Sequence, residues 1–171
     1  MTIAIKPTAS GSTIEQNGST ILTVDSSGNI TPSNQLYSKV PAFSAYQSSA
    51  QTPSAGTWTK IQYQTEEFDT SSCFDNATNY RFTPNVAGYY QISGRAENGS
   101  AFNVMTLSIY KNGSPFKNSS YGSTMAGVQV SALIYFNGST DYVEAYLNQS
   151  SANALVATPA GTYFQGFLAS V

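Results

Sequence analysis

"AGTYFQGFLASV", residues 160–171, closes a chain in which only 9% of the 171 residues are charged. Terminal segments are usually polar and loosely held unless other parts of the protein pack against them. This one instead gathers five large apolar side chains: Tyr163, Phe164, Phe167, Leu168 and Val171. Such a nearly continuous hydrophobic run is typical of a strand that is buried on both faces. The segment therefore raises the question of what covers each face.

The rest of the chain has the pattern of an all-β protein. Asn-Gly dipeptides, which favour the positive φ angles of tight hairpin turns, occur at 17–18, 98–99, 112–113 and 137–138. Segments of alternating polarity rich in β-branched and aromatic residues lie between these turns, for example "VQVSALIYF" at 128–136. No stretch of a dozen residues has a helical period. We expect strands throughout.

Composition excludes several classes of function. The net charge is −2 and the seven basic residues are scattered, which argues against binding a nucleic-acid backbone. The first ten residues lack the apolar run of a signal peptide, and no stretch is long enough to cross a membrane. We therefore expect no membrane partner. A polar, charge-poor surface without a signal peptide is typical of virion proteins, which assemble inside a host and are then released.

Catalysis and metal binding have little support in the sequence. Histidine is absent, so the usual general base and the commonest metal ligand are missing, and Cys73 has no histidine to activate it. We expect no enzyme and no cofactor. Glu66, Glu67, Asp69 and Asp75 are weak candidates for a calcium site, but strand alternation separates the two glutamates. A solvated loop is the favoured interpretation of this acidic segment.

Two parts can be distinguished along the chain. Residues 1–36 form short predicted hairpins with little apolar mass, and such hairpins are marginal in water without a partner surface. We interpret them as an anchoring arm, and residues 37–171 contain enough strands for a two-sheet sandwich. The arm residues expected to contact a partner are Ile3, Ile5, Ile14, Ile21, Leu22 and Val24.

The second part resembles the globular head of the complement q-subcomponent, within the tumour necrosis factor-like jelly rolls. Five blocks occur in the order of that family: "PAFSAY" (41–46), "NYRFTPNVAGYYQISG" (79–94), "LSIYKNGSPF" (107–116), "STDYVEAYL" (139–147) and "YFQGFLASV" (163–171). The fourth block departs from the family pattern, because serine and threonine precede its aspartate in place of the usual glycine.

This resemblance implies a jelly-roll sandwich whose last strand lies in the middle of an inner sheet, facing the three-fold axis of a homotrimer. That placement would cover the terminal strand on both faces. We predict these residues at the trimer interface: Tyr142, Tyr146, Tyr163, Phe164 and Phe167. For Tyr142 and Tyr146, which alternate with Val143, Ala145 and Leu147, ordinary sheet alternation with half-exposed tyrosines is the alternative.

The arm segment "NGSTILTVDSSGNIT" (17–31) resembles short β-motifs that open many tailed-phage virion proteins. Together with the head, this implies a phage structural protein. The favoured role is a capsid decoration, or cement, protein on the outer surface of the shell, with the major capsid protein as partner. A tail-fibre or tail-tip adhesin that binds a host surface glycan or protein is the alternative, and a secreted receptor-ligand module is a third. The short arm, without coiled-coil heptads or glycine-rich repeats, favours decoration.

Overall fold

The computed structural model describes residues 3–32, 40–99, 104–119 and 127–171, and every regular element in them is a β-strand. None of these residues belongs to a helix that could span a membrane. The chain divides into two compact units, Met1–Ser38 and Lys39–Val171, where the sequence suggested a boundary after residue 36. We call the two units the arm and the head, and describe each separately.

The arm is one four-stranded antiparallel sheet. Its strands lie in sequence order: β1 (Ile3–Thr8), β2 (Gly11–Gln16), β3 (Ser19–Asp25) and β4 (Ile30–Pro32). Asn17 and Gly18 join β2 to β3 with φ angles of 52° and 83°, as the type I′ turn of an Asn-Gly hairpin requires. Asp25 closes the next turn by accepting hydrogen bonds from the backbone of Ser27 and Asn29. Local turn chemistry thus determines the register of this small sheet.

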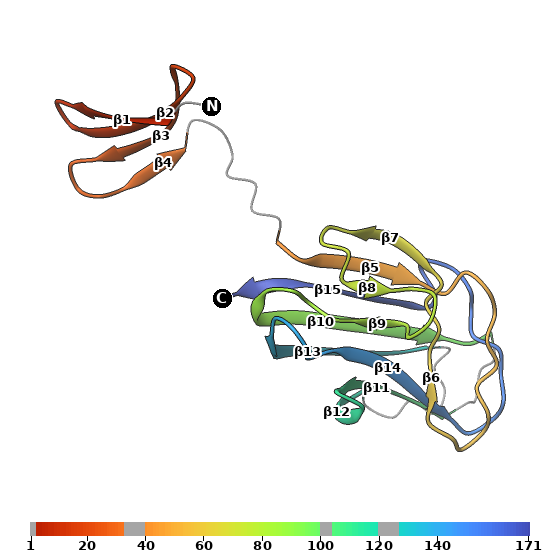
Figure 1. Ribbon diagram of the computed structural model, residues 1–171. Coiled ribbons are helices and arrows are strands. Elements are labelled where there is room, and N and C mark those ends of the chain that lie inside the picture. The colour runs from red at the N-terminus through yellow and green to blue at the C-terminus, as the bar shows by residue number, and fades with distance from the viewer. Residues whose placement is uncertain (1–2, 33–39, 100–103, 120–126) are drawn as a thin grey trace. The chain divides into compact units, whose positions relative to one another are not determined.

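The head contains two sheets that enclose one core (Figure 1). The five-stranded sheet has the order β13 (Gly127–Asn137), β10 (Ala87–Glu97), β15 (Tyr163–Ser170), β5 (Ala42–Tyr46), β7 (Thr65–Asp69). The six-stranded sheet has the order β12 (Ser114–Asn118), β11 (Met105–Lys111), β14 (Val143–Gln149), β9 (Arg81–Phe82), β8 (Phe74–Asp75), with β6 (Thr59–Lys60) also paired to β14. All of these strand pairs are antiparallel.

Aromatic side chains dominate the core between the two sheets. Phe43 of β5 lies at the centre, stacked on Phe82 with ring centroids 4.3 Å apart and on Phe74 at 5.0 Å. Phe164 of β15 meets Phe43 edge to face at 5.3 Å and stacks on Tyr63 at 5.5 Å. Offset and edge-to-face pairs of this kind stabilise a core beyond the area that they bury. The rings therefore lock the middle of the five-stranded sheet onto the opposite sheet.

The terminal strand β15 lies in the middle of the five-stranded sheet, between β10 and β5, as the resemblance implied. Within one protomer it is buried on one face only. Phe164 and Gly166 point into the sandwich, whereas Gln165 and Phe167 are exposed on the other face. A Cβ atom at Gly166 would lie 2.5 Å from Cδ1 of Ile92 and 2.9 Å from the carbonyl oxygen of Gln91. The absence of a side chain at this position lets the core close.

The Asn-Gly dipeptides do not all form hairpins. Asn112 and Gly113, with φ angles of 52° and 78°, connect β11 to β12 in a type I′ turn as predicted. Asn137 and Gly138 instead follow β13, whose successor β14 belongs to the other sheet, so the chain cannot turn straight back on itself. Here the side-chain oxygen of Asn137 accepts hydrogen bonds from the backbone of residues 139–141. The dipeptide at 98–99 adjoins residues outside the described ranges.

Candidate assembly surfaces

The outward face of the five-stranded sheet carries a group of half-exposed apolar side chains, which we call the head patch. β10, β13, β15 and β7 each place at least one residue on this face by strand alternation. Their exposed fractions lie between 49% and 56%. The head patch consists of Phe68, Tyr89, Leu133, Tyr135 and Phe167. Clustered apolar side chains on an exposed sheet are typical of an interaction surface, whereas scattered ones are not.

Two paired tyrosines form one side of the head patch. Tyr89 and Tyr135 are direct cross-strand partners on β10 and β13, and their rings meet at 5.3 Å with an interplanar angle of 63°. Leu133 lies two residues before Tyr135 and on the same face of β13. A cross-strand pair of aromatic side chains stabilises the two strands by about 0.2–1 kcal/mol. The pair therefore places two rings side by side on the outward face of the sheet.

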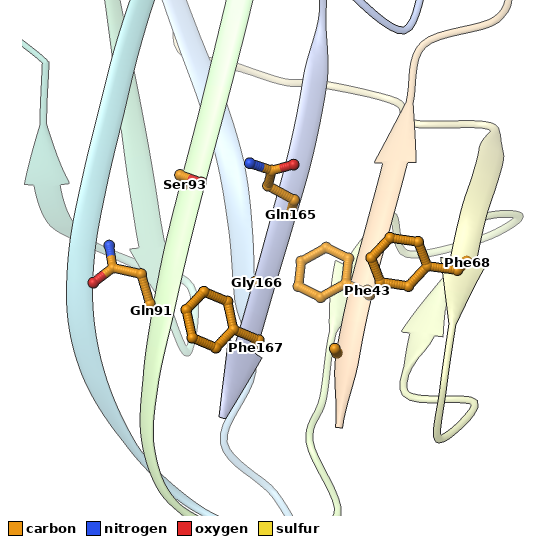
Figure 2. Close-up of a pocket in the computed structure, with 8 residues that line it drawn as sticks. Phe43, Phe68, Gln91, Ser93, Gln165, Gly166 and Phe167 are labelled. Atoms are coloured by element: carbon orange, nitrogen blue, oxygen red, sulfur yellow. The ribbon is translucent and has the colours of Figure 1, made fainter. Parts of the chain in front are cut away.

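A shallow cavity of about 200 Å³ lies on the other side of the head patch (Figure 2). Phe167 of β15 and Phe68 of β7 contribute rings to its lining, and Gln91, Ser93 and Gln165 contribute polar side chains. Gln91 also donates a hydrogen bond to the Ser131 hydroxyl at 2.6 Å. The face therefore combines exposed apolar rings with ordered amide and hydroxyl groups. This is the composition of protein–protein interfaces, in which an apolar centre is bordered by polar groups.

The predicted interface residues do not share one surface. Phe167 belongs to the head patch, and Tyr163, on the same face, is half-buried and accepts a hydrogen bond from Gln129 at 3.3 Å. Phe164 is fully buried among core rings, so the structure corrects its assignment: its side chain is not available to a second protomer. Tyr146 on β14 and Tyr142, the residue before that strand, are part of the other sheet. They face away from the sandwich there, since Val143, Ala145 and Leu147 fill the core as predicted.

Four residues of the head patch were missed in the sequence: Phe68, Tyr89, Leu133 and Tyr135. A signal for two of them was present in "VQVSALIYF", because Ile134 and Phe136 alternate with them and point into the core. A strand with one buried face should carry polar residues on the other, and Leu133 and Tyr135 break that rule. Phe68 gave no such signal. The register between β5 and β7 shifts beside it, so simple alternation along the segment does not predict which face Phe68 occupies.

The arm also has an apolar face. Ile5, Ile14 and Leu22 are direct partners across β1, β2 and β3, so their side chains share one side of the sheet. Ile3, two residues before Ile5, and Val24, two residues after Leu22, lie on the same side. Val24 is paired with Ile30, which was not among the residues predicted from the sequence. Ile21, the remaining predicted contact, lies at a register shift between β2 and β3. We call this surface the arm face: Ile3, Ile5, Ile14, Leu22, Val24 and Ile30.

The arm face is poorly covered. Ile5, Ile30 and Ile3 are 71%, 62% and 59% exposed. Burying a side chain of this size fully is worth about 1.5–3 kcal/mol, so a partner surface gains a few kcal/mol from three of them. A single four-stranded sheet with one open apolar face is stabilised by whatever covers that face. The arm is thus suited to dock on another surface.

The acidic segment does not assemble a metal site. Asp69 accepts hydrogen bonds from the backbone of Ser71 and Phe74, and Asp75 accepts them from the backbone of residues 77–79. These backbone hydrogen bonds hold the pKa of Asp75 at about 2. Glu67 accepts a hydrogen bond from the Ser44 hydroxyl, while burial and Asp69 raise the pKa of Glu66. Among the described residues no three acidic or cysteine side chains converge on one point.

No family model matches the sequence, and no match was found among the curated proteins. Solved structures do match. Murine APRIL at pH 5.0 aligns with a TM-score of 0.58 and 12% identity, over 75% of this chain and 98% of that one. The Eiger TNF of S. frugiperda aligns with a TM-score of 0.60 and 6% identity, over 77% and 93%. The PRD1 vertex protein P5 aligns with a TM-score of 0.54 and 19% identity, over 75% and 96%. The fold is a tumour necrosis factor-like jelly roll, as the sequence blocks predicted.

Proposed function

We propose that this protein is a homotrimeric phage capsid decoration protein whose head associates with itself and whose arm binds the shell. The observation that carries the proposal is the presence of two separate apolar sheet faces, one on each compact unit. A protein with one binding task needs one such face. Two faces on two units are suited to two different partners.

The head patch is assigned to a second and a third copy of the chain. Its members carry no charge, and their rings are half-exposed in one protomer, so association would remove several aromatic side chains from water. Closed cyclic symmetry is the usual outcome for association through such a face, because an open contact would grow into filaments. The matching fold of the PRD1 vertex protein supports a place in a virion for a jelly roll of this kind.

The arm face is assigned to the shell. One arm offers only a few kcal/mol of apolar burial, which is too weak for stable attachment of a monomer. Three arms on one trimer bind in sequence, and each later arm meets its site at the high effective concentration set by the first. Attachment to neighbouring shell subunits would tie those subunits together. Decoration by a trimer therefore stabilises the shell without any chemistry, and we assign the protein no enzymatic role.

The test is binding of purified full-length protein to particles that lack it, measured by co-sedimentation. The variant Ile5→Ser/Ile30→Ser removes two exposed members of the arm face and should reduce the bound fraction at least tenfold. Its control, Ala4→Ser/Thr31→Ser, changes the neighbouring residues on the other side of the same two strands. Equal binding by the two variants would refute the role of the arm face. Binding by neither the wild type nor the control would refute the decoration role itself.

A further inference from the structure

A second group of aromatic side chains lies on the outward face of the six-stranded sheet, on the other side of the head from the head patch. We call it the aromatic strip: Trp58, Tyr110, Tyr142 and Tyr146. Tyr110 of β11 and Tyr146 of β14 stack with centroids 4.1 Å apart and an interplanar angle of 24°. Trp58, 40% exposed, lies 6.1 Å from Tyr110. The strip plays no part in the proposed assembly.

Charged groups lie directly beside these rings. Lys60 forms an ion pair with Glu144, whose side chain is 5% exposed, and its ammonium group lies 5.8 Å from the centroid of Tyr146. The guanidinium of Arg81 lies 4.3 Å from the centroid of Tyr142. Both distances are typical of cation–π contacts, which hold cation and ring together. The strip therefore presents aromatic rings and fixed polar groups on one surface.

Arg81 has unused hydrogen-bonding capacity. Within the part of the chain that the structure describes, its guanidinium forms no ion pair. The nearest acidic residue by register is Asp75 on β8, but both oxygens of that carboxylate already accept hydrogen bonds from residues 77–79. Glu144, in turn, is paired with Lys60. A planar guanidinium with free donors is suited to bind a carboxylate through two parallel hydrogen bonds.

We infer that the aromatic strip binds an acidic polysaccharide, with sugar rings lying on the aromatic faces and a uronate carboxylate on Arg81. A pyranose ring presents C–H groups on its faces and hydroxyl groups at its rim, so it needs apolar rings beside hydrogen-bonding groups. Trp58 and the Tyr110–Tyr146 stack provide the former. The tyrosine hydroxyls beside these rings provide the latter. Rigid aromatic side chains lose little conformational entropy on binding, which makes such a surface effective without a deep pocket.

Single-stranded nucleic acid also stacks on aromatic rings, but it requires a basic groove that follows its backbone. In this strip Glu144 neutralises Lys60, and the chain carries a net charge of −2. The strip therefore lacks the run of basic groups that a phosphate backbone requires. A sugar polymer needs only one carboxylate to meet Arg81.

The strip and the head patch are on different sheets, so this inference is independent of the proposed decoration role. A trimer formed through the head patch would leave three strips accessible on its outside. Each strip could then hold a separate stretch of a long polymer, and the contacts would add by avidity. The strip would give a particle an affinity for acidic surface polysaccharides.

The experiment measures the mobility of full-length protein in native gels that contain polygalacturonate, alginate or hyaluronan. Fully methyl-esterified polygalacturonate serves as the uncharged probe and oligothymidylate as the nucleic-acid probe. Wild-type protein should be retarded by at least one uronate polymer, and about tenfold more weakly by the ester. Trp58→Ala should abolish retardation. Arg81→Gln should reduce retardation by polygalacturonate to the level seen with the ester.

The matched control is Lys117→Gln. It removes the same charge from an exposed residue of β12 that pairs with the core residue Ile109, so it lies off the strip. This variant should behave as wild type, and thermal unfolding checks that all three variants are folded. Four results would overturn the inference: no retardation by any uronate polymer, unchanged retardation in Trp58→Ala, equal retardation by acid and ester, or tighter binding of oligothymidylate.

Discussion

Gly166 gives the sharpest test of the head's packing. An alanine Cβ at this position would lie 2.5 Å from Cδ1 of Ile92, 2.9 Å from the carbonyl oxygen of Gln91 and 3.1 Å from Cε1 of Phe43. Two of these distances are shorter than real Cβ contacts allow, and the side chains of Ile92 and Phe43 are buried on all sides. The residue sits in regular strand backbone, so the substitution acts through crowding and not through φ.

The expected loss in the free energy of unfolding follows from two opposing effects. Overpacking of a filled core costs about 1–3 kcal/mol. Replacing glycine by alanine restricts the unfolded chain and returns about 0.4–1 kcal/mol. Gly166→Ala should therefore destabilise the protein by roughly 1–2 kcal/mol, which lowers the midpoint of thermal unfolding by about 2–8 °C for a domain of this size. Gly99→Ala, with no atom within 4 Å of its Cβ, should leave the midpoint unchanged or slightly higher.

A double-mutant cycle identifies the atom responsible. Ile92→Val removes Cδ1 and costs about 0.5–1.5 kcal/mol alone. In combination with Gly166→Ala it should cost less than the sum of the single changes, with a coupling of about 1 kcal/mol. Unfolding is followed by circular dichroism at one fixed protomer concentration, because self-association would shift the midpoint. Additive losses, or a Gly166→Ala variant as stable as wild type, would show that β15 does not pack against β10 in the way described.

Three further predictions concern other parts of the molecule. Phe167→Asp places a charge in the head patch and should convert a trimer to monomers in sedimentation, whereas Phe116→Asp, at a ring on β12 that is 42% exposed, should not. Trimers of both variants would exclude this face. The Tyr63 hydroxyl is buried without a hydrogen-bond partner among the described residues, so Tyr63→Phe should raise the free energy of unfolding by about 1 kcal/mol. Tyr90→Phe loses a hydrogen bond to the Val86 carbonyl and should lower the free energy of unfolding by about as much. The reverse order of stability in chemical denaturation would contradict these contacts. Burial raises the pKa of Tyr90 to about 12, so the folded state retains a proton that the unfolded chain releases above about pH 10. The free energy of unfolding should therefore fall as the pH rises from about 10 to 12, and a flat profile would argue against this burial.

The sequence was informative about the fold because its strongest signals are local. Asn112-Gly113 fixes a hairpin by backbone conformation alone, and the alternation of Val143, Ala145 and Leu147 identifies the face of β14 that fills the core. The terminal segment was recognised as a central strand through the order of the family blocks. Local periodicity and a known order of blocks were sufficient for the architecture.

The surfaces were harder to predict because they depend on which strands share a sheet. Alternation assigned Tyr146 to the outward face of its strand, but it could not show that β14 belongs to the sheet opposite β15. Phe164 and Phe167 both appeared as interface residues in a continuous hydrophobic run, although an odd separation places them on opposite faces. Phe68, in a polar segment, reaches the head patch only through its long-range pairing with Ser44 of β5.

The proposed function requires that this protein decorates a phage shell as a trimer. An electron cryomicroscopy reconstruction of the particle that carries this chain would test that claim most directly. We expect trimeric density at three-fold positions of the shell, with the arms in contact with shell subunits and the heads projecting outward. Density for this chain at the tail alone, or single heads without trimeric association on the shell, would contradict it.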